Sequence, residues 1–149
     1  MEAAAKTLLQ QSVGIGDEEL SKLDPRTDRF LGKIFGNIPS AMQYRIVAEV
    51  THSKYCFAGI KAGDRIVFDP FLNGGKTTCP LCPRALLPLL VSCQQYWERF
   101  IELADRGVER PEEINDTAFA GVAGCLDPGI EYGGLGHVAF SLYSERIDQ

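Results

Sequence analysis

The chain has 149 residues, a hydrophobic content of 45% and a net charge of −5 at pH 7. This length fits one domain, or one domain with an appendage, and the apolar content argues against a disordered chain. No apolar run approaches ~18 residues, so we expect no membrane span. Acidic residues outnumber basic ones and no basic stripe is present, so we expect no nucleic-acid partner.

The first residues lack the charged-then-apolar order of a signal peptide, so we expect a cytoplasmic protein. The cytosol is reducing, and the chain has five cysteines, which is an odd number. Both facts argue against a framework of structural disulfides. Metal binding, catalysis or burial remain as explanations of the cysteines.

Helical patterns fill the first forty residues. Residues 2–12 have high helix propensity, and Asp17 is placed to cap a short helix. Asp24-Pro25 is typical of an N-cap followed by proline at the first helical position. Apolar residues then recur at helical spacing: Phe30, Leu31, Ile34, Phe35 and Ile38. We therefore predict a helical extension over 1–40 whose apolar face packs on the rest of the chain, on a protein partner or on a second copy.

Strand patterns follow the extension. Residues 44–51 alternate between apolar and polar types, as in a half-buried strand. Arg65–Asp69 is a second β-prone run, and Pro70 ends it. Near the end of the chain, Val138, Phe140 and Leu142 share one face of a third strand.

The clearest element is an amphipathic helix from Pro83 to Arg106, with apolar residues on one face and charged residues on the other. Residues 111–136 are predicted to be mostly loop, with a short helix near 111–115. Together these elements predict an α+β fold, in which a small β-sheet packs on one long amphipathic helix and a helical arm precedes it. The arm covers 1–40 and the cysteine-containing domain covers 41–149.

Four cysteines lie at turns. Cys79 and Cys82 form a Cys-Pro-Leu-Cys knuckle, which can supply two metal ligands, and Cys56 and Cys125 stand singly at glycine-rich turns. Zinc and iron–sulfur clusters both need several converging thiolates, so we predict a metal site of these four residues holding zinc or, alternatively, an iron–sulfur cluster. Cys93 falls within the apolar face of the helix and is predicted to be a core residue.

Cys79 and Cys82 directly precede Pro83, where the long helix begins. The positive end of a helix favours thiolate over thiol, so we expect a lowered pKa at these cysteines. That effect would help metal binding and redox chemistry alike.

The chain has two histidines. His52 has the same strand parity as Ile46, Ala48 and Val50, which predicts an inward-facing side chain. His137 begins the last strand. Either imidazole could complete a site that lacks one thiolate, or act as an acid or base.

Two aspartates and a glycine run are predicted to serve turns. Asp64 and Asp127 lie beside glycines, where a short carboxylate forms local hydrogen bonds to the backbone. The Gly-Gly-Leu-Gly run at 133–136 is not a phosphate loop, because no Lys-Ser/Thr pair and no helix follow it.

One order of residues is shared with a known pattern: Cys56, a Lys-x-Gly-Asp turn at 61–64, Cys79 before a proline and an apolar helix, and Cys125 before the last strand. This order resembles a short, cysteine-containing, functionally uncharacterised family of anaerobic bacteria and archaea. The resemblance covers about residues 43–143 and not the helical arm.

The resemblance implies that Cys56, Cys79 and Cys125 are the shared site positions. Cys82 looks like an addition of this chain. A histidine associated with the turn in that family is replaced here by Ile60. The resemblance implies no established activity.

Several functions fit these patterns. The first is a small metal-binding protein that serves as a subunit or accessory of a larger enzyme. A closed four-thiolate zinc site would be structural, whereas Cys56, Cys79 and Cys125 with water or His52 would leave an open position for catalysis. The second is a thiol-redox protein that uses the Cys79/Cys82 pair, although no apolar strand directly precedes the pair. The third is a small metal- or cysteine-dependent enzyme. A partner-binding module with inert cysteines is the remaining alternative.

Overall fold

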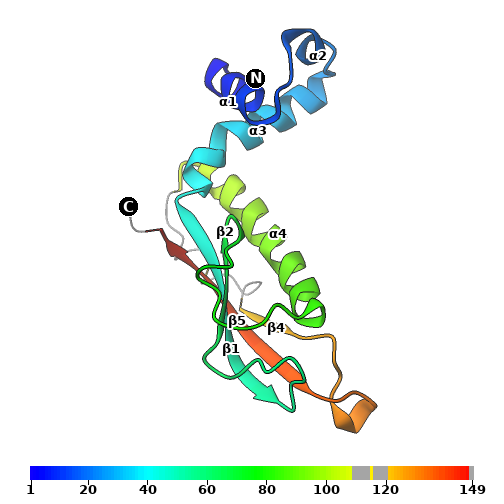
Figure 1. The fold of residues 1–149 in the computed structure, drawn as a ribbon. Coiled ribbons are helices and arrows are strands. Elements are labelled where there is room, and N and C mark those ends of the chain that lie inside the picture. Colours follow the sequence, from blue (N-terminus) through cyan, green and yellow to red (C-terminus); the bar gives the residue numbers. More distant parts are fainter. Residues whose placement is uncertain (109–114, 116–120, 148–149) are drawn as a thin grey trace.

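A computed structural model describes residues 1–108, 115 and 121–147. In these residues an antiparallel sheet packs on one long helix, and three more helices lie beyond one end of the sheet (Figure 1). The predicted α+β fold, with a sheet on one long helix and a helical arm, is confirmed. Within the described ranges, no helix has the length and apolar content needed to cross a bilayer.

The arm contains the three predicted helices. They are α1 (Ala3–Val13), α2 (Asp17–Ser21) and α3 (Pro25–Ala41). The Asp24 carboxylate accepts hydrogen bonds from the backbone amides of Arg26 at 2.8 Å and Thr27 at 3.1 Å, which confirms it as the N-cap of α3. Asp17 is instead the first residue of α2, and Gly16 takes the cap position.

The arm is attached to the domain by helix packing. α1 packs on α3, and α3 packs on α4. An ion pair of 3.0 Å joins Lys33 of α3 to Asp105 of α4. Leu9 of α1 is buried, whereas Phe30 of α3 remains 61% exposed. The apolar face predicted for the arm is therefore covered only in part by the chain itself.

The sheet has the strand order β3-β2-β1-β5-β4, and all of its pairs are antiparallel. The strands are β1 (Tyr44–Lys54), β2 (Arg65–Asp69), β3 (Phe71–Leu72), β4 (Val122–Gly124) and β5 (His137–Arg146). The three predicted strands are confirmed, although β1 runs three residues beyond the expected end at 51. β4 and a 3₁₀ turn at Ile130–Tyr132 lie in the segment predicted as loop, and the short helix expected near 111–115 falls outside the described residues except for 115.

α4 (Pro83–Asp105) covers one face of the sheet, here called the inner face (Figure 1). Its buried side chains are Ala85, Leu89, Cys93, Tyr96, Phe100 and Leu103. They meet Ile46, Ala48, Val50, Phe140 and Leu142 of the two central strands. The Tyr96 hydroxyl donates a hydrogen bond of 3.0 Å to the Leu142 carbonyl, so its polar end is satisfied inside this core. Cys93 is a core residue, as predicted.

A β-bulge interrupts β1. Val50 pairs with Phe140 and His52 pairs with Ala139, which leaves Thr51 as an extra residue without a partner in the ladder. An extra residue reverses the alternation of side chains beyond it. His52 is therefore exposed on the face opposite the core, here called the outer face, and the prediction that it points inward is wrong.

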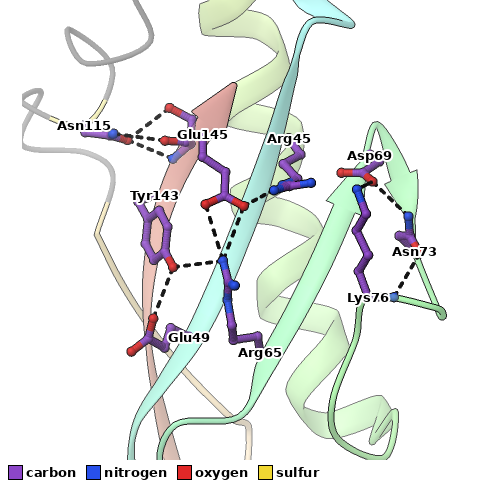
Figure 2. A network of polar contacts seen from close by, with 10 residues as sticks. Arg45, Glu49, Arg65, Asp69, Asn73, Lys76, Asn115, Tyr143 and Glu145 are labelled. Atoms are coloured by element: carbon purple, nitrogen blue, oxygen red, sulfur yellow. Dashed lines mark hydrogen bonds and ion pairs between the residues drawn. The ribbon is translucent and has the colours of Figure 1, made fainter. Parts of the chain in front are cut away.

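Polar side chains cover part of the outer face (Figure 2). The Glu145 carboxylate accepts hydrogen bonds from the guanidinium groups of Arg45 and Arg65. Arg65 also donates to the Tyr143 hydroxyl at 3.2 Å, and this hydroxyl donates to Glu49 at 3.1 Å. The network links two guanidinium groups, one phenol hydroxyl and two carboxylates across β1, β2 and β5.

A second polar group fixes the chain after β3. Asp69 accepts a hydrogen bond from the Asn73 side chain at 2.8 Å and pairs with Lys76 at 3.2 Å (Figure 2). The Thr77 hydroxyl accepts from the Val67 amide at 3.1 Å. These contacts direct the chain from the sheet edge toward the start of α4 and its cysteine knuckle.

Candidate functional site

Three separate segments bring the four predicted site cysteines to the end of the domain where α4 begins. Cys56 follows β1, Cys79 and Cys82 precede α4, and Cys125 follows β4. Each of the four is half-buried and packs against the same hydrophobic core. Figure 1 shows the start of α4 beside β4 and the lower part of the long β1–β5 pair.

A tight turn places Cys56. The Gly59 amide donates to the Cys56 carbonyl at 3.0 Å. The preceding residue, Tyr55, has a φ of 53°, an uncommon value for a residue other than glycine. Gly136 lies directly against this segment, because a Cβ at Gly136 would be 2.3 Å from the Tyr55 carbonyl oxygen. The start of β5 thus fixes the backbone beside Cys56.

The first turn of α4 joins the knuckle to the Cys125 segment. Cys82 is the N-cap residue of α4, and its carbonyl accepts from the amides of Ala85 at 3.0 Å and Leu86 at 2.9 Å. The Leu126 amide donates to the Arg84 carbonyl at 3.0 Å. This bond holds the residue after Cys125 against the turn that follows Cys82.

Cys125 is held against β5. Its amide donates to the Val138 carbonyl at 2.9 Å, and its thiol sulfur accepts from the Val138 amide at 3.3 Å. The sulfur thus acts as a weak acceptor in a fixed position at the edge of the core.

Asp127 organises the glycine-rich loop beside the cysteines. Its Oδ1 accepts from the amides of Gly129 at 3.0 Å, Leu135 at 2.9 Å and Gly136 at 3.2 Å, and its Oδ2 pairs with Arg84 at 3.1 Å. These partners, the Gly129 amide foremost, hold the pKa of Asp127 below its usual value. The predicted turn role is confirmed, and three of the loop's amides are already bonded to this carboxylate.

The pKa of the Cys79 thiol differs from the value expected from the sequence. Burial, and then the negative charges of Asp64 and Cys56, raise the pKa of Cys79 from 9.0 to about 11. The expected lowering by the helix is wrong for this residue, because loss of solvent and two like charges outweigh the helix field. Asp64 lies near Cys79, because the hydroxyl of the preceding residue, Thr78, donates to the Asp64 carboxylate at 3.4 Å. Asp64 caps its own turn by accepting from the Lys61 amide at 2.8 Å, and nothing in the sequence spacing links it to Cys79.

A slow reaction of Cys79 with alkylating agents is expected from this pKa. At neutral pH the thiolate fraction of Cys79 is roughly a hundredfold below that of an ordinary thiol, and the higher nucleophilicity of a basic thiolate recovers only part of that factor. In metal-free protein, iodoacetamide should label Cys79 at least about tenfold more slowly than in the unfolded chain, and the rate should rise until pH about 11. Peptide mapping by mass spectrometry measures it. Preferential labelling of Cys79 at pH 7 would contradict the prediction.

His52 lies apart from the predicted cysteine site. Its ring is on the outer face of the sheet, 6.1 Å from the ring of His137 between centroids. The cysteines pack on the inner side instead. Among residues 1–108, 115 and 121–147, no three His, Cys, Asp or Glu side chains are grouped closely enough to hold a metal ion.

Nothing matches this chain among protein-family models, curated proteins or solved structures. The resemblance to a cysteine-containing family of anaerobic microbes therefore stays a prediction, and the candidate function depends on the site itself.

Proposed function

We propose that this chain is a small cytoplasmic metal-binding protein in which Cys56, Cys79, Cys82 and Cys125 bind one zinc ion. The observation that supports it best is that four half-buried cysteines from three different segments pack against the same core near the start of α4, where a negative charge on Cys56 contributes to the raised pKa of Cys79. Two thiols placed together in a partly desolvated position repel each other as thiolates. A divalent cation removes that repulsion and favours both thiolates.

The donor set suits zinc. Four thiolates form a closed tetrahedral shell, and a closed shell is structural. Among the described residues, no group of three or more His, Cys, Asp or Glu side chains is close enough to hold a metal ion. The cysteine side chains must therefore turn toward one another to form the shell. Backbone hydrogen bonds fix the segments that carry Cys56, Cys82 and Cys125, and this supports a site to which all three contribute. An iron–sulfur cluster uses the same ligands and is the alternative.

The redox alternative has less support. A dithiol that attacks disulfides needs a thiolate at neutral pH. The pKa of Cys79, raised to about 11, keeps this thiol protonated under those conditions. Cys79 is therefore a poor attacking group in the metal-free chain, whereas zinc binding would displace its proton.

The helical arm supports an accessory role. Phe30 remains 61% exposed on α3, although α1 and α4 cover other parts of that helix. We propose that this arm contacts a protein partner, a larger enzyme or a second copy of the chain. The mass of the purified protein in solution, measured by light scattering, distinguishes a self-associating chain from a monomer that requires another partner.

The test of the metal site is the metal content and visible spectrum of protein purified without oxygen. We expect about one zinc per chain. Cys79→Ser should remove it, because it deletes a ligand. Cys93→Ala is the matched control: it also removes a thiol, but from the core, and it should leave the metal content unchanged.

The outcomes separate the alternatives. Iron and sulfide with a brown colour would retain the cysteine ligands and replace zinc by a cluster. Metal-free protein that takes up no zinc on addition would overturn the proposal. Equal loss of zinc in Cys79→Ser and Cys93→Ala would show that general destabilisation, rather than ligand loss, governs the metal content.

A further inference from the structure

The only two histidines of the chain lie side by side on the outer face of the sheet. Their ring centroids are 6.1 Å apart and their planes are inclined by 42°. His52 comes from β1 and His137 from β5, so more than half of the chain separates them in sequence. Both side chains are exposed.

The bulge in β1 creates this pair. His52 is opposite Ala139 and His137 is opposite Lys54, so the two histidines are diagonal neighbours in the ladder. In a regular strand, residues 50 and 52 would share one face and His52 would point to the core together with Val50. The bulge instead directs both imidazoles to the same face, at a spacing that side chains on diagonal positions can bridge.

Two small residues on β4 and β5 lie beside the rings, and Lys54, opposite His137, has its ammonium group over the ring of Tyr55. Ala139 is the direct neighbour of His52 on β5, and Gly124 of β4 is opposite Ala139. A Cβ at Gly124 would lie 3.7 Å from Cε1 of His137, so the absence of a side chain there leaves space beside that ring. Both histidines are exposed, so a ligand from solvent can reach the two side chains.

We propose that His52 and His137 form a second metal site, which binds one divalent transition-metal ion that prefers imidazole, such as Ni²⁺, Cu²⁺ or Zn²⁺. When two imidazoles bind one ion through nitrogens about 2.1 Å from it, the distance between the ring centres depends on the nitrogen–metal–nitrogen angle. This distance is roughly 4.5 Å when the angle is a right angle and roughly 6.5 Å when the arrangement is linear. The observed separation falls inside this range. Water completes the coordination, so the ion is exchangeable and exposed to small anionic ligands.

This site is independent of the thiol site. The histidines lie on the outer face, whereas the four cysteines pack on the inner side of the sheet. Neutral imidazole also selects ions differently from thiolate, since nickel and copper(II) accept nitrogen ligands readily. The proposal therefore holds whether or not zinc occupies the cysteines.

The test is a calorimetric titration of the full chain with Ni²⁺, with the imidazole proton resonances followed by NMR. Because the chain has only two histidines, two variants, His52→Gln and His137→Gln, suffice to assign the imidazole signals. We expect both resonances to broaden together in the unmodified chain. Each variant should weaken Ni²⁺ binding at least about tenfold, and the double variant should be little worse than either single one, because one remaining imidazole cannot chelate.

Other results would overturn the proposal. Ni²⁺ affinity that is unchanged in both histidine variants but falls in Cys79→Ser would assign the ion to the thiols. Histidine losses that simply add would show two separate single-ligand contacts. Far-UV circular dichroism of each variant verifies the fold, and unchanged zinc content in the histidine variants keeps this test separate from that of the cysteine site.

Discussion

Phe140→Ala should lower the free energy of unfolding by about 3–5 kcal/mol, the usual range for removing a fully buried aromatic ring. Phe140 has no exposed surface, and it belongs to β5, between β1 and β4. Its ring packs in the core cluster that includes α4. Removing it leaves a cavity between the sheet and the helix that neighbouring side chains fill only in part. Urea denaturation followed by circular dichroism measures the change.

Phe57→Ala is the matched control, because Phe57 is 94% exposed. The same chemical change at this surface position should alter the free energy of unfolding by no more than about 0.5 kcal/mol. Comparable losses in the two variants would contradict the assignment of Phe140 to the centre of the core.

Gly136→Ala should destabilise the protein by about 2–3 kcal/mol and reduce zinc binding at the same time. The added Cβ would lie 2.3 Å from the carbonyl oxygen of Tyr55 and 2.6 Å from its carbonyl carbon. Both are backbone atoms, so the clash is relieved only when β1 and β5 separate locally. Cys56 directly follows Tyr55, and the displacement is therefore expected to reach the proposed metal site. Denaturation midpoints and zinc content of the same preparation measure both effects.

Gly36→Ala is expected to change the stability in the opposite direction. Gly36 lies within α3, and a Cβ there would meet no atom within 4 Å. Alanine inside a helix is more stable than glycine by roughly 0.5–1 kcal/mol, so this variant should be slightly more stable and should bind zinc normally. A similar loss in both glycine variants would contradict the steric argument for Gly136.

The helices were predictable because their signals are local. Asp24-Pro25 marks the start of α3, and the apolar face beginning at Pro83 fixes α4 within one residue of the observed end. Pairing between distant strands leaves no such local signal. No sequence pattern near His52 predicts the bulge, because the extra residue is defined only by the register of β1 against β5. The short β4 was missed for the same reason, since three residues gain their strand conformation from pairing with β5.

The sequence predicted that four cysteines lie at turns, but it did not predict the electrostatics around them. The Cys-x-x-Cys spacing and the turns at Cys56 and Cys125 indicated the cysteines from sequence alone. The raised pKa of Cys79 depends on burial and on Asp64, fifteen positions earlier, so the helix argument considered only one of the competing effects. The proximity of the two histidines was not predicted from the sequence. It follows from the register between β1 and β5, and patterns in a single sequence do not contain that register.

The position of β5 between β1 and β4 has a consequence for how the protein folds during synthesis. β1 pairs with β5 along nearly its whole length, but about 80 residues separate the end of one strand from the start of the other, which ribosomes translate in roughly 4 to 16 s. During that interval β1 and β2 can form a hairpin, while the other edge of β1 lacks its native partner. Contacts between such distant segments also slow folding in general. The nascent chain therefore exposes an apolar strand edge until its last strand is made, and it is at this stage that chaperone binding or aggregation would compete with folding.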